Sequence, residues 1–219
     1  MKKLGIYLAG KIESNGWRQH IIDIRNTFCG DDYDPSEKSI NKLKNASVDV
    51  DEKCYVTGPF FLSCDHSCYH GDGSHGLGKG NEYNCYGYSR CFLPNEVIEI
   101  CTEQIRRADI IIAYIDDNTC YGTLFEIGLA KQMGKTIVTV FDTKKRANDM
   151  WFIAMNSDYS TNLENIKNKQ DDSLHYCKID DDDKRIVITT IINKLIDYQS
   201  VKIKSRIREE IPVFMKLFE

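Results

Sequence analysis

The segment from Ala108 to Phe141, "ADIIIAYIDDNTCYGTLFEIGLAKQMGKTIVTVF", constrains the fold more than any other part of the chain. The apolar run from Ala108 to Ile115 predicts a buried strand, and "KTIVTVF" predicts a second one. Between them, apolar residues at helical spacing predict a helix over Phe125–Met133, with Gly134 as its C-terminal stop. A strand, a helix and a strand in so short a segment indicate a βαβ unit with two parallel strands.

The remaining pattern predicts more units of the same kind. We therefore expect an α/β fold, a flavodoxin-like (Rossmann-like) doubly wound, mostly parallel sheet of about five strands. Residues 30–52 are polar without a clear period, which suggests an exposed connection, and the polar stretch 157–170 suggests no element. Further strands are expected within 3–10, 53–64 and 173–179, and helices within 17–28, 97–105 and 147–156. The acidic run at 180–183 predicts a helix start, followed by C-terminal helices within 182–219.

Length and composition narrow the class of protein. With 219 residues, 42% of them hydrophobic, the chain suits one domain over 1–219. A formal net charge of −4 gives no electrostatic footprint for duplex nucleic acid, and a small molecule is the expected partner. No apolar run reaches the length of a membrane span, and the N-terminus lacks a signal-peptide pattern. We therefore expect a cytoplasmic protein whose nine cysteines are reduced.

A long inserted loop is predicted over 65–93, rich in glycine, histidine and cysteine. Loops of this length inside a compact domain are usually functional or disordered. One hypothesis places His66 and His70 at the mouth of an active site, where they bind phosphate or base. Another is a zinc site made by these two histidines with Cys64 and Cys68, although C-x-H-x-C-x-H is not the usual finger spacing. Plain loop packing is the third.

Glu126 has two possible roles. "TLFE", Thr123 to Glu126, matches a capping box, in which the glutamate reaches back to the amide of the capping threonine. The helix also begins just after the carboxyl end of a buried strand, where open α/β sheets bind their ligands. Asp116 and Asp117 end that strand, so three carboxylates can gather there and separate one another's pKa values. The alternative for the two aspartates is turn formation and helix capping.

Three motifs in order resemble the nucleoside 2-deoxyribosyltransferase superfamily. They are "GIYLAGKI", "ADIIIAYIDD" and "YGTLFEIGLAKQMGKTIV", within residues 3–18 and 95–141. The resemblance implies an enzyme in which Glu126 is the nucleophile and Tyr7 lies near it on the first strand. One departure is Cys120, which stands where typical transferases carry an aspartate. Further residues that we expect at the substrate are Gly10, Asp116, Asp117, Gly122 and Thr123.

Two residues near the first strand have open roles. Trp17 is able to stack on a nucleobase, although aromatic residues are more often part of the core. Arg18 is able to pair with a 5′-phosphate, or it is a solvated charge at a helix start.

The predicted activity is cleavage of the N-glycosidic bond of a nucleoside or nucleoside 5′-phosphate, with water giving hydrolysis and an incoming base giving transfer. Glu126 would capture or stabilise the positive charge at C1′, while Asp116, Asp117 or His66 would protonate the departing base. One alternative is a glycosidase that acts on NAD or another nucleotide as a defence or toxin effector. Another is a nucleotide-sensing module without turnover. No cofactor or metal is expected for the reaction, and the resemblance suggests a homo-oligomer.

Overall fold

The computed structural model describes residues 3–11, 16–22, 37–59, 94–164, 176–177, 179 and 181–215, and the statements below refer to these. The inserted loop, with His66, Cys68 and His70, and the preceding Cys64 lie outside the described residues, so their expected roles stay predictions. Within the described part, no helix is long and apolar enough to cross a membrane.

The centre of the fold is a seven-stranded sheet in the order β2-β3-β1-β4-β5-β6-β7. The five inner strands are parallel, and each outermost strand is antiparallel to its neighbour. Counted along the chain, the parallel strands have the order 2-1-3-4-5, which is the flavodoxin-like order and confirms the predicted fold. The strands are β1 (Leu4–Gly10), β2 (Val48–Asp49), β3 (Cys54–Gly58), β4 (Ile110–Ile115), β5 (Thr136–Phe141), β6 (Tyr159–Asn162) and β7 (Tyr176–Cys177).

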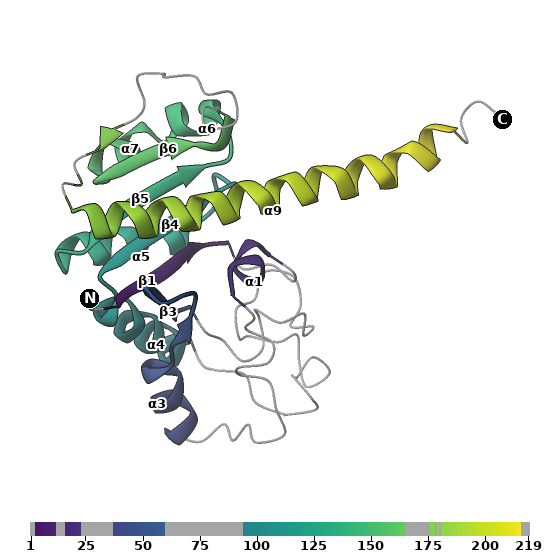
Figure 1. Ribbon diagram of the computed structural model, residues 1–219. Helices are drawn as coiled ribbons and strands as arrows, with labels where there is room; N and C mark the ends of the chain where they lie inside the picture. Colours follow the sequence, from purple (N-terminus) through teal and green to yellow (C-terminus); the bar gives the residue numbers. More distant parts are fainter. Residues whose placement is uncertain are drawn as a thin grey trace.

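Helices cover both faces of the sheet (Figure 1). On one face lie α5 (Tyr121–Gln132), α6 (Lys144–Asp149) and α7 (Trp151–Asn156), and α4 (Pro94–Arg107) packs beside α5. On the other lie α1 (Trp17–Ile21) and α9 (Asp182–Met215), which crosses the sheet and continues past it (Figure 1). The remaining described helix, α3 (Glu37–Asn45), packs on α4.

The three central strands β1, β4 and β5 each contribute to two hydrophobic cores. In β1, Ile6 and Leu8 belong to the core under α9, whereas Tyr7 and Ala9 belong to the core under α5. This division follows from the alternation of side chains along a strand. All four side chains are fully buried, as expected for a central strand covered on both faces.

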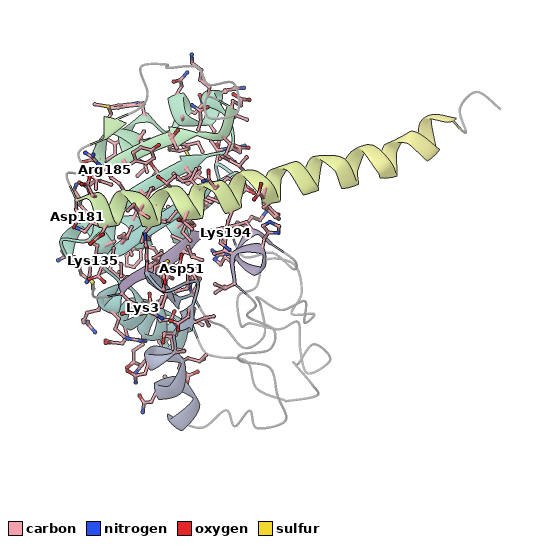
Figure 2. The ribbon with its side chains drawn as sticks, viewed as in Figure 1. Lys3, Asp51, Lys135, Asp181, Arg185 and Lys194 are labelled. Atoms are coloured by element: carbon pink, nitrogen blue, oxygen red, sulfur yellow. The ribbon has the colours of Figure 1, made fainter. Side chains whose placement is uncertain are left out.

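The predicted C-terminal helices form one continuous helix, α9, within the described residues. Its start agrees with the acidic pattern, because a side-chain oxygen of Asp181 accepts a hydrogen bond of 3.1 Å from the amide of Lys184. Arg185 adds a bond of 2.6 Å from its Nε to the carbonyl oxygen of Ile179, and Figure 2 shows Asp181 and Arg185 together at this end of the helix.

Residues 30–52 are not simply an exposed connection, because they contain α3 and β2. Leu43 of α3 is buried, and its carbonyl oxygen accepts a bond of 3.0 Å from the side-chain amide of the buried Gln104. The helix expected over 147–156 is also different, since it is divided at Met150 into α6 and α7.

The polar stretch 157–170, where no element was expected, contains the parallel strand β6. Its serine and threonine side chains are buried. The hydroxyl of Thr139 on β5 lies 3.1 Å from those of both Ser157 and Ser160, so hydrogen bonds satisfy these three hydroxyl groups inside the protein. The buried hydroxyl of Thr161 has no hydrogen-bond partner among the described residues.

Candidate active site

The candidate site lies where the order of the parallel strands reverses, at the carboxyl ends of the neighbouring strands β1 and β4. β1 ends at Gly10 and β4 ends at Ile115, and α5 begins shortly after β4. A crevice forms at such a point because the connections from the two strands leave on opposite faces of the sheet. The sequence-predicted residues Tyr7, Gly10 and Glu126 meet there.

Glu126 does not take part in a capping box. α5 begins at Tyr121, and Cys120 occupies the cap position without a side-chain cap bond. The amide of Leu124 already donates 3.1 Å to the carbonyl oxygen of Cys120, which closes a helical turn before Thr123 can serve as a cap. Thr123 is buried inside the helix, and Glu126 lies beyond the first turn. The capping interpretation of "TLFE" is therefore wrong.

The carboxylate of Glu126 instead accepts a hydrogen bond from the hydroxyl of Tyr7, with 2.5 Å between the two oxygens. Tyr7 is fully buried. Burial raises its pKa well above the ordinary value, and the neighbouring Cys101 and Glu126 raise it further. Tyr7 thus keeps its proton over the ordinary pH range, and a donor of this kind favours the charged form of the carboxylate.

Cys101 is a site residue that the sequence did not single out. It belongs to α4, it is half-buried, and its side chain is a hydrogen-bonding neighbour of the Tyr7 hydroxyl. In the sequence it is one member of the apolar stripe of a helix, so only the contact with Tyr7 distinguishes it.

A cavity of about 420 Å³ opens in front of Glu126, between α4, α5 and the end of β1. Its wall is largely apolar, with side chains from both helices. Lys11, Thr119, Cys120 and Thr123 add polar groups near the start of α5. The described lining residues include Gly10, Lys11, Cys120, Tyr121, Gly122 and Phe125.

Two glycines give access to this cavity. Gly10 has a φ of +151°, and a Cβ there would lie 2.8 Å from the carbonyl oxygen of Tyr114 and 3.2 Å from the ring of Trp17. Only glycine suits such a backbone conformation and such close packing. Gly122 lies one helical turn before Glu126, is exposed, and would meet nothing within 4 Å if it carried a Cβ. The space above Gly122 is thus open to a ligand that approaches the carboxylate.

Asp116 and Asp117 do not join Glu126 among the described residues that line the cavity. Asp117 accepts bonds of 2.8 Å from the amide and from the hydroxyl of Thr119, and it lies 3.4 Å from the ammonium of Lys11. The bonds from Thr119 lower the pKa of Asp117, and Lys11 adds to the effect. Asp117 is therefore ionised and acts in the turn, contrary to the expectation that crowding would leave it protonated.

The guanidinium of Arg18 is buried, and backbone carbonyl groups hold it in place. The residue is 4% exposed. Its Nε donates 2.7 Å to the carbonyl oxygen of Leu8, Nη1 donates 3.0 Å to that of Lys11, and Nη2 donates to that of Gly10. The solvated-charge alternative is wrong, because these bonds use Arg18 to hold the end of β1. A phosphate contact stays a prediction.

Trp17 is buried in the core under α9, in edge-to-face contact with Tyr114 at 5.7 Å between ring centroids. This supports the core role over stacking on a nucleobase. The ring also lies under the guanidinium of Arg18, at 5.0 Å. The ring of Trp17 therefore packs close to the backbone at Gly10 and leaves no room for a side chain there.

No family model, curated protein or solved structure matches this chain. Glu126 presents a hydrogen-bonded carboxylate to an apolar cavity. Cys120 adds a thiol whose pKa is raised, chiefly by burial and also by Asp117 and Asp116, so this thiol stays neutral. A carboxylate in such a cavity is suited to contact a carbon that develops positive charge.

Proposed function

We propose that this protein is an enzyme that cleaves the N-glycosidic bond of a nucleoside or nucleoside 5′-phosphate, with Glu126 as the nucleophile. The observation that carries the proposal is the 2.5 Å hydrogen bond from Tyr7 to Glu126, at the wall of a cavity at the switch point of the sheet. The sequence resemblance to the nucleoside 2-deoxyribosyltransferase superfamily supports the same role.

The reaction proceeds through a charged sugar. As the bond between C1′ and the base nitrogen breaks, its electron pair leaves with the base, and positive charge spreads over C1′ and the ring oxygen. The Glu126 carboxylate then forms a bond to C1′ and gives a glycosyl ester. Water releases the free sugar, whereas an incoming base gives transfer.

The surroundings of Glu126 suit a nucleophile. The buried hydroxyl of Tyr7 donates to the carboxylate and favours its charged form. Because the cavity wall is largely apolar, the charge interaction with a developing cation is stronger than it would be in water.

A substrate screen tests the proposal. The protein is incubated with deoxynucleosides, their 5′-phosphates and NAD, and free base is measured by chromatography. Glu126→Ala and Glu126→Gln should abolish release, because neither side chain can form the ester. Glu52→Gln is a matched control, since Glu52 is exposed and lies away from the cavity lining. Mass spectrometry of the quenched wild-type protein should find the sugar on the peptide that contains Glu126.

A nucleotide-sensing module is the second candidate, favoured by the neutral Cys120 thiol where the resembled family carries an acid. Under this alternative, Glu126→Ala binds nucleotides about as tightly as the wild type, and no substrate in the screen releases base. Full activity in both Glu126 variants would instead refute the nucleophile assignment.

We also expect a homo-oligomer, as the resemblance suggests. Light scattering of the purified full chain over a range of concentrations tests this. A constant monomer mass would contradict it.

A further inference from the structure

Two aromatic side chains line the cavity on the same helix as Glu126. Tyr121 and Phe125 lie one helical turn apart on α5, so they share one side of it, and they are 74% and 65% exposed. The face of an aromatic ring attracts a delocalised cation. Exposed rings beside a carboxylate are therefore suited to a flat, positively charged ligand.

The charges of the lining residues lead to the same class of ligand. Lys11 and Glu126 are the two charged residues among the described lining residues. The ammonium of Lys11 lies 3.4 Å from the carboxylate of Asp117, which offsets its positive charge, whereas the carboxylate of Glu126 accepts a hydrogen bond from the neutral hydroxyl of Tyr7. The N-terminal end of α5 acts against a cation with about half a unit charge. The full negative charge of Glu126 outweighs that effect.

Among the described residues, two neutral acids beside the cavity, Cys120 and Tyr7, hold their protons too tightly to protonate a departing base. Burial raises the pKa of the Cys120 thiol. The hydroxyl of Tyr7 donates its hydrogen bond to Glu126, and burial keeps the pKa of this hydroxyl high. Asp117 is ionised, as described above. These groups suit a glycosidic bond that breaks without a proton.

We propose that the substrate is an N-glycoside whose base is a cationic heteroaromatic ring, such as a pyridinium or an N-alkylated purine. This inference rests on the proposed function of Glu126. The ring stacks against Tyr121 and Phe125, and its charge faces the Glu126 carboxylate. NAD belongs to this class, as do simple pyridinium nucleosides.

The reaction balances without a general acid. The C1′–N bond breaks, and its electron pair neutralises the positive charge of the ring nitrogen, so the base leaves as a neutral molecule. Glu126 bonds to C1′, and water then hydrolyses the ester. The products are the free sugar, the neutral base and one proton, which is released to solvent.

The first test measures binding of a matched pair of probes, 1-methylnicotinamide, which is a cation, and nicotinamide, which is neutral. By calorimetry, the wild-type protein should bind the cation roughly tenfold more tightly. Glu126→Gln should remove the difference, and Phe125→Leu should reduce it several-fold. Phe152→Leu is the control, because Phe152 is 63% exposed but lies outside the cavity lining.

The second test measures turnover of nicotinamide riboside and of its reduced, neutral form. Each rate of base release is divided by the uncatalysed rate at the same pH, because cationic N-glycosides are intrinsically more labile. We expect the rate enhancement to be at least roughly a hundredfold larger for the cationic glycoside than for the neutral one. The neutral base needs a proton in order to leave, and a general acid that supplies it typically accelerates a reaction by about that factor. 7-Methylguanosine and guanosine provide a second matched pair.

The two proposals fail in different ways. Equal affinity for the two probes, or equal rate enhancement for neutral and cationic glycosides, overturns the cationic-base inference while cleavage by Glu126 stands. Another outcome is that the protein prefers 1-methylnicotinamide in a way that depends on Glu126 and yet releases no base from any substrate. That result would support recognition of the cation and refute the assignment of Glu126 as the nucleophile. Loss of the preference in Phe152→Leu would refute the role of Phe125.

Discussion

The hydroxyl of Tyr7 donates a 2.5 Å hydrogen bond to the carboxylate of Glu126, across 119 positions of sequence. Tyr7 is fixed by the central strand β1, which pairs with β3 and β4, and Glu126 is fixed by α5. The position of the carboxylate thus depends on how this helix packs on the sheet, which couples the candidate chemistry to the core under α5.

Tyr7→Phe should shift the pH dependence of the activity. Phenylalanine fills the same space but donates no hydrogen bond, so the charged form of Glu126 loses support. A hydrogen bond to a charged group contributes about 1.5 to 3 kcal/mol. We therefore expect the acidic limb of the rate profile for base release to move up by about one to two pH units. Tyr114→Phe, a buried tyrosine in the opposite core, should leave the profile unchanged; an equal shift there would contradict the assignment.

Comparison of Gly122→Ala with Gly128→Ala should distinguish an effect on substrate access to the cavity from an effect on the stability of the fold. Both glycines are exposed on α5, and a Cβ at either one would meet nothing within 4 Å. Each substitution should stabilise the fold by up to about 1 kcal/mol, because alanine favours a helix. Only Gly122→Ala should raise KM for base release, since only Gly122 lines the cavity. Similar kinetics for the two variants would show that substrate does not pass over Gly122.

Arg18→Ala should destabilise the protein by about 3 kcal/mol, because the carbonyl groups of Leu8, Gly10 and Lys11 lose a charged donor. Arg18→Lys should recover only part of this, since an ammonium cannot match the planar fork. Urea unfolding measures both. The ratio of KM for a nucleoside to KM for its 5′-phosphate should not change in Arg18→Lys, whereas a selective loss for the phosphate would identify Arg18 as a phosphate ligand.

Stability should fall at alkaline pH. Burial, with a smaller effect of Asp51, raises the pKa of the Cys54 thiol from 9.0 to about 12. The unfolded chain loses this proton near pH 9 and the folded chain keeps it, so unfolding becomes more favourable as the pH rises from about 9 to 12. Tyr7, whose pKa is raised from 10.0, adds to the decline at higher pH.

Urea unfolding at pH 7, 9 and 10.5 measures this decline. Cys54→Ala should be less stable at pH 7, because it leaves a small cavity, but its stability should fall less steeply above pH 9. An identical slope in the wild type and in Cys54→Ala would exclude the thiol as the cause.

The sequence predicts the centre of the fold well. The strand from Leu4 to Gly10 and the unit from Ile110 to Phe141 are present within two residues of the expected strand limits, and Gly134 ends α5 with a φ of +68°. These segments are buried on both faces, so their composition alone indicates the structure.

Other elements depend on tertiary contacts that local patterns do not contain. β6, with Ser160 and Thr161, lacks the apolar composition of an inner strand, and its burial is possible because Thr139 on β5 satisfies part of its hydroxyl groups. The buried Arg18 is similar, since its partners are backbone carbonyl groups, which every sequence supplies.

The candidate site was predictable where its residues lie on the strongly patterned central elements, and not where it depends on tertiary contacts. Gly10 ends a strand that the pattern locates, Tyr7 lies within that strand, and Glu126 lies on the predicted helix, and the three meet as expected. The helix start itself was placed too late, because a capping motif in sequence does not show which amide closes the first turn. Cys101 was missed, since its contact with Tyr7 depends on how α4 packs on β1.

The two-residue strands β2 and β7 have a consequence for behaviour at high concentration. Each runs antiparallel to the outermost parallel strand and covers part of its open side. An uncovered strand edge is a template on which other chains can add strands and grow into fibrils. Because a strand as short as β2 leaves few backbone groups to pair with, this cap should hinder edge-to-edge pairing between sheets of different molecules during concentration and storage.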